Sequence, residues 1–280
     1  MKSAAELAAE QAAYWKGRGG EGWLASYERI ARTVGSFGKA ALEAAAPAPG
    51  EQVLDIGCGT GGTTAELARA VGPTGHVLGV DISDVLVEAA RAERVDNATF
   101  VVGDAATHPF KPAGYDLVFS RFGVMFFAEP DMAFRNFQRA LKPDGRLVFV
   151  CWRTPQENPW GMVPVRAAAA HLPPMPRPGP EDPGQFAFGD RARVERILAA
   201  AGFGTPSFAP LDQPIWMGGN VAEVLDNAGR FGPLARAFAD ATPAQIEKAK
   251  EAIAEALKPH ESADGVVLPG ACWLVRAAAR

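Results

Sequence analysis

Short apolar runs alternate with helical segments between residues 53 and 152, and this alternation constrains the fold more than any other feature of the sequence. Five of the runs are predicted to be strands, at residues 53–56, 76–80, 99–102, 115–120 and 146–152. Strands that are apolar on both faces and separated by helices indicate a parallel sheet with helices on both sides. The sequence therefore predicts an α/β fold built on a doubly wound sheet.

A helical arm is predicted to precede this core. Residues 1–46 are rich in alanine, and the glycine-rich patch Gly17–Gly22 is expected to break their helical pattern. The segment Pro47–Gly50 ends the arm, because proline and glycine together punctuate regular structure. The core is therefore predicted to span residues 47–152.

Proline content separates the next part of the chain from the core. Nine prolines fall between Pro155 and Pro183, too many for a long helix or a central strand. Residues 153–189 are therefore predicted to form a cap insertion that contains one short helix near Val163–Ala170.

Regular structure is expected to resume in residues 190–280, which supply one more core helix and two more strands. The strands are predicted at residues 205–217 and 271–276. A pair of helices at about 220–258 is predicted to extend the cap, and its second helix opens with a capping box from Thr242 to Gln245. Thr63 and Glu66 predict a similar capping box after the first strand.

Charge and composition exclude several classes of protein. The chain has 280 residues, of which 48% are hydrophobic and 21% charged, as in ordinary globular proteins. Its net charge is −4 with no basic stripe, which disfavours a nucleic-acid partner. No run of about 18 apolar residues is present, so no membrane span is predicted. Glu6 and Glu10 interrupt the only N-terminal stretch that could resemble a signal peptide, so we expect a cytoplasmic protein.

The cysteines and histidines do not indicate a metal site. The three cysteines lie far apart in the sequence, and none of the four histidines has metal-ligand spacing to another. No metal is therefore predicted. A homodimer remains possible from the sequence.

The segment VLDIGCGTGG at residues 53–62 is the main chemical signal. Glycines between a strand and a helix let the backbone turn sharply and approach a ligand closely. Gly57, Gly59 and Gly62 match a dinucleotide fingerprint, but Asp55 stands two residues before the first of them. A carboxylate there would repel a pyrophosphate and suits a ligand that carries positive charge.

Two further acids end predicted strands. Asp81 follows the second strand, where a carboxylate can accept hydrogen bonds from both hydroxyls of a ribose. Asp104 ends the third strand and can accept from an adenine amino group, with the Ala105 N–H nearby. Because the carboxyl ends of parallel strands edge one crevice, these acids and Asp55 together describe a site for adenine, ribose and a positively charged amino-acid tail.

These residues resemble the class I S-adenosylmethionine-dependent methyltransferases, in particular the small-molecule enzymes of the ubiquinone/menaquinone-biosynthesis type. The matching segments are Val53–Gly61, Gly79–Ser83, Gly103–Ala105, Tyr115–Phe127 and Leu141–Phe149, with weaker similarity at Ile197–Phe203. The resemblance implies a Rossmann-like sheet of seven strands, the last antiparallel, and S-adenosylmethionine as cofactor.

The resemblance also implies roles for individual residues. Asp55 and Gly57 are expected to face the methionine part of the cofactor, and Ser120 to lie beside its methyl group. Ile82 is expected to pack on the adenine. The full expected cofactor-binding set is Asp55, Gly57, Cys58, Gly59, Gly61, Asp81, Ile82, Asp104, Ala105 and Ser120.

Candidates for contact with the methyl acceptor follow the fourth strand. Arg121 either contacts an anionic acceptor or forms a structural ion pair, and Phe122 is the neighbouring candidate. His108 is either a general base at the mouth of the site or a solvated loop residue. No dedicated catalytic residue is predicted, since a sulfonium donor is already activated.

Three aromatic residues of the arm, Trp15, Trp23 and Tyr27, either close over the cofactor or anchor the arm to the sheet. The cap insertion carries more apolar residues than a solvated loop requires. Either arm and cap enclose an apolar pocket over the methyl group, or these apolar residues pack the insertion onto the sheet or onto a second subunit.

The sequence thus predicts methyl transfer to an oxygen or a carbon atom, in preference to nitrogen, of a small and fairly apolar molecule. One alternative is a protein that binds S-adenosylmethionine without turnover, as a sensor or partner subunit. A second alternative is an NAD-dependent oxidoreductase, which Asp55 disfavours.

Overall fold

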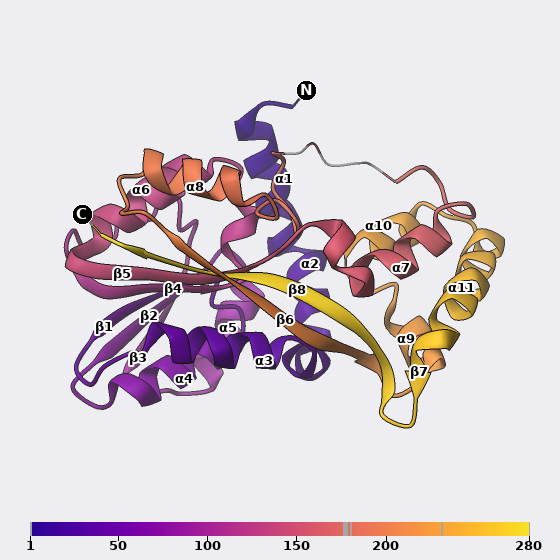
Figure 1. The fold of residues 1–280 in the computed structure, drawn as a ribbon, viewed down its shortest axis with the longest axis horizontal. Helices are drawn as coiled ribbons and strands as arrows, with labels where there is room; N and C mark the ends of the chain where they lie inside the picture. The colour runs from indigo at the N-terminus through magenta and orange to yellow at the C-terminus, as the bar shows by residue number, and fades with distance from the viewer. Residues whose placement is uncertain (1, 176–178, 180, 231, 280) are drawn as a thin grey trace.

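The centre of the molecule is a sheet with the strand order β3-β2-β1-β4-β5-β8-β6, and the short β7 pairs with β8 (Figure 1). This computed structural model describes residues 2–175, 179, 181–230 and 232–279. Its strands are β1 (Gln52–Ile56), β2 (His76–Asp81), β3 (Ala98–Val102), β4 (Tyr115–Arg121), β5 (Leu141–Trp152), β6 (Ser207–Gly218), β7 (Glu261–Ser262) and β8 (Gly265–Ala278). Strands β1 to β5 pair in parallel, whereas β8 is antiparallel to both β5 and β6. The predicted doubly wound sheet with an antiparallel last strand is confirmed, and β7 is a two-residue addition.

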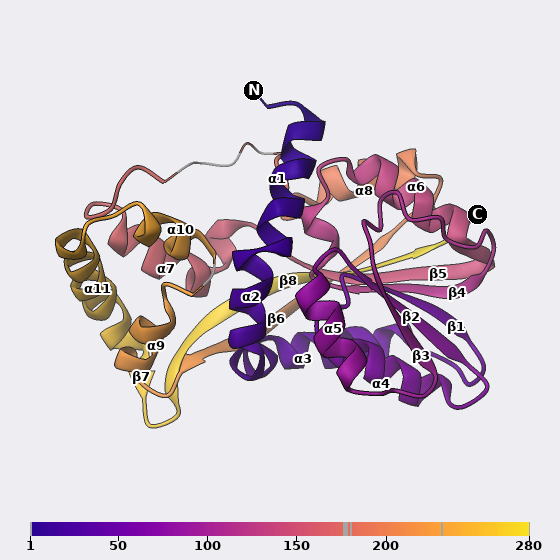
Figure 2. The ribbon, with the colours of Figure 1, turned by 180° about the vertical axis from the view of Figure 1, so that it is seen from behind.

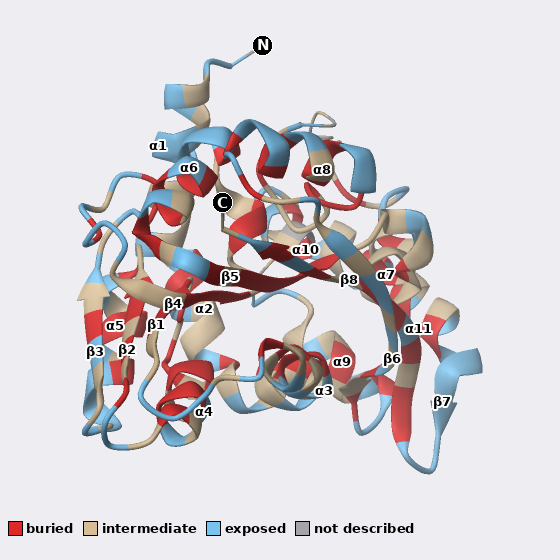
Figure 3. Ribbon diagram, turned by 60° about the vertical axis from the view of Figure 1, so that its left-hand side comes forward, coloured by how far each residue is buried: buried red, intermediate tan, exposed pale blue. Residues whose placement is uncertain are grey.

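Helices cover both faces of this sheet, as Figure 1 shows. One face carries α3 (Tyr27–Ala45), α4 (Gly62–Val71) and α5 (Asp84–Ala92), and the other carries α6 (Pro130–Ala140) and α8 (Arg191–Ala200). The central strands β1, β4 and β5 are largely buried, whereas the edge strands β3 and β6 are mostly exposed or half-buried (Figure 3). This burial explains why the strands are apolar on both faces.

Two local predictions in the core are wrong. The capping box at Thr63 and Glu66 does not form, because α4 begins at Gly62, after the left-handed Gly61, two residues earlier than a cap at Thr63 requires. Thr63 and Thr64 therefore lie inside the helix and are buried. Leu141 follows Phe134 and Phe137 at helical spacing in the sequence, which predicts that it belongs to the same helix, but it begins β5. The capping box at Thr242 and Gln245 is confirmed.

The glycine-rich patch breaks the N-terminal arm at Gly17, as predicted, but the rest of the patch is helical. Helix α1 (Ala4–Lys16) ends at Gly17, but α2 (Arg18–Ala25) runs through Gly19 and Gly20. A Cβ atom on Gly20 would lie 2.4 Å from the Ser83 hydroxyl, so the missing side chain lets α2 pack closely on the start of α5. Tertiary packing therefore outweighs the low helix propensity of glycine at this position.

The cap lies beyond the carboxyl ends of β5 and β6 and has its own hydrophobic cluster. The helices of the cap are α7 (Pro159–Ala168), α9 (Val221–Asn227), α10 (Gly232–Ala239) and α11 (Pro243–Leu257). Elsewhere along the described chain, short 3-10 helices follow β4 (η1, Val124–Phe126), β5 (η2, Pro155–Glu157) and α11 (η3, Lys258–His260). The predicted helical pair at 220–258 is therefore three helices. Residues 176–178 and 180 of the predicted Pro-rich cap lie outside the described residues.

Within the part of the chain that the structure describes, no helix is both long enough and apolar enough to cross a lipid bilayer.

Candidate functional site

The glycine loop between β1 and α4 depends on backbone conformations that favour glycine. Gly57, Gly59 and Gly61 have φ values of +68°, +55° and +82°. A Cβ atom on Gly57 would lie only 2.9 Å from the Cα atom of Gly123, in the loop after β4. The two loops therefore touch backbone to backbone, which only glycine at both positions permits.

Asp55 lies at the carboxyl end of β1 and is almost fully buried. Its carboxylate accepts a hydrogen bond of 2.7 Å from the Thr64 hydroxyl on α4. Burial raises the pKa of Asp55 to about 6, and the charges of Arg121 and Asp81 act on it in opposite directions. A buried carboxylate with one hydroxyl partner retains capacity for a cationic group.

Asp81 joins the glycine loop to the next strand end. Its carboxylate accepts from the backbone N–H groups of Gly59 and Ser83, each at 2.9 Å. Burial raises the pKa of Asp81, and the backbone hydrogen bonds oppose that rise. The Ser83 hydroxyl beside it is buried without a hydrogen-bond partner among the described residues, a vacancy that sequence analysis missed.

The third acid, Asp104, follows β3 and is exposed. It accepts a hydrogen bond from the Ala106 N–H at 2.9 Å, whereas Ala105 is buried and its carbonyl accepts from Asn136. Ile82 is half-buried after β2. The structure thus brings Asp55, Asp81 and Asp104 to one edge of the sheet, as the sequence predicted.

The side chains of Cys58 and Ser120 are both buried within the fold. Burial raises the pKa of the Cys58 thiol well above its usual range, so this thiol is a poor nucleophile. The Ser120 hydroxyl donates to the Ile56 carbonyl at 2.8 Å and accepts from the Gly123 N–H at 3.2 Å. Ser120 therefore links the ends of β1 and β4, and its expected position beside the methyl group stays a prediction.

The arm lies directly over the glycine loop. A Cβ atom on Gly62 would be 2.8 Å from the Tyr27 hydroxyl, and one on Gly59 would be 3.8 Å from the Trp23 indole nitrogen. The ring of Trp15 packs 5.1 Å from Phe126 and 6.0 Å from Trp23, between centroids. In Figure 2, α1 and α2 stand between the sheet and the cap.

The acceptor candidates are not all brought together. Phe122 is buried, with the left-handed φ of +65°, and its ring stacks on Trp152 at 4.5 Å. Arg121 is half-buried at the end of β4. His108 follows β3, three strand positions from β4, and its ring packs on Phe110. His108 and Arg121 therefore do not form one catalytic pair.

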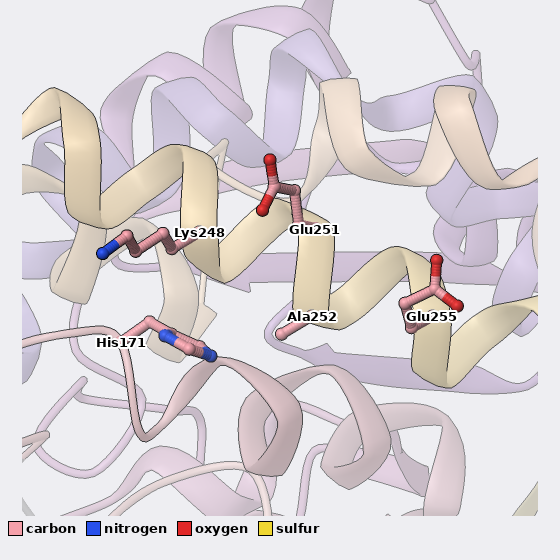
Figure 4. A pocket seen from close by; sticks show the side chains of 5 residues that line it. All are labelled: His171, Lys248, Glu251, Ala252 and Glu255. Carbon is pink, nitrogen blue, oxygen red and sulfur yellow. The ribbon is translucent and has the colours of Figure 1, made fainter.

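Other hollows lie away from this site. One of about 450 Å³ lies in the cap between α11 and the end of α7, and Figure 4 shows His171, Lys248, Glu251 and Glu255 around it. Another, of about 410 Å³, lies at the amino ends of the strands and includes His76. Within the described ranges, no three His, Cys, Asp or Glu side chains are grouped to hold a metal ion.

Comparison with known proteins assigns the central region to a family. Residues 53–145 match the family described as "Methyltransferase domain". The C-methyltransferase UbiE of ubiquinone/menaquinone biosynthesis from Shewanella frigidimarina is 34% identical over 122 residues, 42% of this chain and 49% of that protein. The demethylmenaquinone methyltransferase of Staphylococcus aureus is 38% identical over 109 residues, 38% of this chain and 44% of that protein. The match spans about half the length of these curated relatives.

A solved structure shows the same fold over most of the chain. The YcgJ protein from Bacillus subtilis superimposes with a TM-score of 0.57 at 19% identity, covering 88% of this chain and 99% of that one. The family match identifies residues 53–145 as a methyltransferase domain of the class I type, the type that takes S-adenosylmethionine as cofactor. Within that class, the chain is related to the ubiquinone/menaquinone-biosynthesis C-methyltransferases, and the resemblance seen in the sequence is confirmed.

Proposed function

We propose that this protein transfers the methyl group of S-adenosylmethionine to a carbon or an oxygen atom of a small, largely apolar molecule. The observation that carries the proposal is a glycine loop with a buried carboxylate, Asp55, enclosed beneath an aromatic arm. The curated relatives, whose names state C-methylation, favour carbon.

The strand-end residues fit the cofactor, which when bound supplies a methyl group on a positively charged sulfur. Asp55 offers a buried negative charge for the ammonium group of the amino-acid tail. Asp81, already fixed by two backbone N–H groups, has remaining oxygen lone pairs for ribose hydroxyls. We expect Asp104 and Ala105, which follow β3, to contact the adenine edge, and Ile82 to pack against its face.

The arm and the cap are suited to exclude water. The Tyr14 hydroxyl on α1 accepts from the Gly232 N–H at 3.3 Å, and the Arg236 guanidinium lies 4.7 Å from the Tyr14 ring centroid. Trp15 holds the same helix against Phe126 at the other side. One helix therefore bridges core and cap over the site, where alignment and water exclusion promote methyl transfer.

The acceptor is expected to bring its own nucleophile. The apolar partners of the arm, Trp15, Trp23 and Phe126, suit a ring or chain with little charge. His108 is separated from the end of β4 by three strand positions, so it is not placed as a base beside the methyl group. An electron-rich carbon of a phenol or enol, or the oxygen of either, meets this requirement.

Cofactor binding is the first test of the proposal. S-adenosylmethionine or S-adenosylhomocysteine is expected to raise the melting temperature, because either ligand binds the native state and not the unfolded chain. NAD at the same concentration is expected to leave it unchanged. A thermal shift with NAD alone would overturn the assignment.

Turnover is the second test and addresses the acceptor. The protein is incubated with S-adenosylmethionine carrying an isotopically labelled methyl group and a panel of small phenols, hydroquinones and enols. Mass spectrometry is expected to locate the label on a carbon or an oxygen of an apolar member. Label that appears only on amines, or only on added nucleic acid, would contradict the proposed acceptor class.

A further inference from the structure

Arg121 is a charged side chain whose role the fold does not explain. It is half-buried at the carboxyl end of β4, beneath α3. Its guanidinium makes no hydrogen bond or ion pair with any residue in the described part of the chain. Taking a guanidinium partly out of water without a partner is unfavourable, so Arg121 has capacity for an anion.

Helix α3 leaves space for this side chain. A Cβ atom on Gly38 would lie 2.9 Å from Cδ of Arg121 and 3.1 Å from its Nη1. Gly38 is in the interior of a 19-residue helix, where glycine costs about 1 kcal/mol relative to alanine. The buried glycine therefore gives up helix stability and leaves room for the Arg121 side chain, which indicates a functional role for the guanidinium at this position.

The sheet register places Arg121 diagonally opposite Asp55. Asp55 on β1 pairs with Phe119 on β4, and Arg121 is two residues further along β4. Side chains two residues apart share a face, so both charges lie on the face covered by α3 and α4. Strand spacing and rise put their Cα atoms about 8 Å apart, with the glycine loop beside them.

Two side chains of opposite charge that reach from these positions toward the glycine loop can bind the two charged ends of an α-amino acid. We propose that Arg121 binds the carboxylate of the cofactor's methionine tail while Asp55 faces the ammonium group, so that the two form a receptor for the zwitterion. The proposal rests on the proposed function, since it presumes that cofactor. A guanidinium can hold a carboxylate with two parallel hydrogen bonds, which fixes the orientation of the tail.

Two other roles for Arg121 are weaker on the same observations. A structural ion pair with Asp55 would require contact, but the carboxylate's observed hydrogen-bond partner is Thr64, and its pKa stays raised despite Arg121. Binding of an anionic acceptor would conflict with the apolar surroundings of the arm. Each of these roles gives a different outcome in the test below.

The test compares two ligands that differ only in the tail. S-adenosylhomocysteine carries the amino-acid group, and 5′-methylthioadenosine has the same nucleoside and sulfur without it. Affinities of both are measured by calorimetry for the wild type, Arg121→Gln and Arg121→Lys. Arg135→Gln, an exposed arginine of α6, is the matched control.

Arg121→Gln is expected to weaken binding of S-adenosylhomocysteine about 10- to 100-fold and to leave 5′-methylthioadenosine unchanged. Arg121→Lys should recover part of the loss, and Arg135→Gln should change neither affinity. Equal weakening of both ligands would indicate a structural role and overturn the proposal. Unchanged binding of both ligands together with lost turnover would assign Arg121 to the acceptor and also overturn it.

Gly38→Ala provides an independent variant in which Arg121 is kept. The added methyl group presses on the Arg121 side chain, so binding of S-adenosylhomocysteine should weaken severalfold while the helix itself is not destabilised. Binding of S-adenosylhomocysteine by the wild type tests the proposed function separately. An unchanged S-adenosylhomocysteine affinity in Gly38→Ala would contradict the inferred position of the guanidinium.

Discussion

Replacing Gly57 with alanine is expected to lower the free energy of unfolding by about 2–5 kcal/mol, the sum of a conformational and a packing cost. The left-handed φ of +68° costs a residue with a side chain roughly 1–2 kcal/mol. The new Cβ atom would also lie 2.9 Å from the Cα atom of Gly123, and overpacking of this kind costs about 1–3 kcal/mol. Backbone atoms cannot rotate away from the contact, so the loops after β1 and β4 must separate.

Gly59→Ala is the matched control for this prediction. Gly59 also has a left-handed φ, of +55°, but its Cβ atom would find its nearest neighbour at 3.8 Å, on Trp23. Only the conformational cost then applies, about 1–2 kcal/mol. Urea unfolding of both variants measures the difference. Equal destabilisation of the two would show that the contact with Gly123 carries no energy.

Much of the fold follows from the sequence because the strands of a doubly wound sheet have a strong signature. The runs at Val53–Ile56 and Arg146–Trp152 are apolar without alternation, which only burial on both faces explains. The acids Asp55 and Asp81 end strands that are neighbours in the sheet, so their meeting at one edge follows from parallel pairing alone. The antiparallel last strand came from the family resemblance, not from these patterns.

The features that the sequence did not predict depend on tertiary contacts. Helix α2 runs through Gly19 and Gly20 because α5 packs there, and propensity carries no record of that neighbour. Thr64 looked like part of a capping motif, yet it lies inside α4 and holds Asp55. The cap at residues 220–258 has three helices and not the predicted pair, because the helical structure breaks between α9 and α10, where Gly229 lies.

In the candidate site too, the residues found from local sequence patterns differ from those that depend on tertiary contacts. The glycine loop and its acids lie within one short segment or at strand ends, so spacing was enough to find them. The slot for Arg121 needs Gly38, which is 83 residues earlier in the chain, and no local pattern connects the two. Phe122 combines a left-handed φ with a ring stacked on Trp152, which lies 30 residues later in the chain, and no local pattern indicates either feature.

Lowering the pH is expected to stabilise the fold through Asp55. Burial raises the pKa of Asp55 to about 6 in the native protein, whereas an aspartate in an unfolded chain has a pKa of about 3.9. As the pH falls through about 6, the native state takes up a proton on Asp55 that the unfolded chain does not, so the contribution of Asp55 to the free energy of unfolding rises until about pH 4. The difference between the two pKa values corresponds to about 3 kcal/mol.

Asp55→Asn isolates this contribution from the other carboxylates. The amide mimics the protonated acid and can still accept from Thr64, so the variant is expected to be about 3 kcal/mol more stable than the wild type near pH 7. The two proteins should have similar stability near pH 4. Urea unfolding at several pH values measures the gap. A gap that does not change with pH would mean that the pKa of Asp55 is not raised in the native state.

The same proton should oppose cofactor binding, because only the ionised carboxylate attracts an ammonium group. Affinity for S-adenosylhomocysteine is expected to fall about tenfold between about pH 7 and pH 5 in the wild type, as Asp55 becomes neutral. Asp55→Asn should bind weakly at both values, with no such fall. Calorimetry at the two pH values checks this, and equal pH dependence in both proteins would contradict it. Folding alone favours the neutral acid at this position, so the buried charge is explained by the ligand and not by stability.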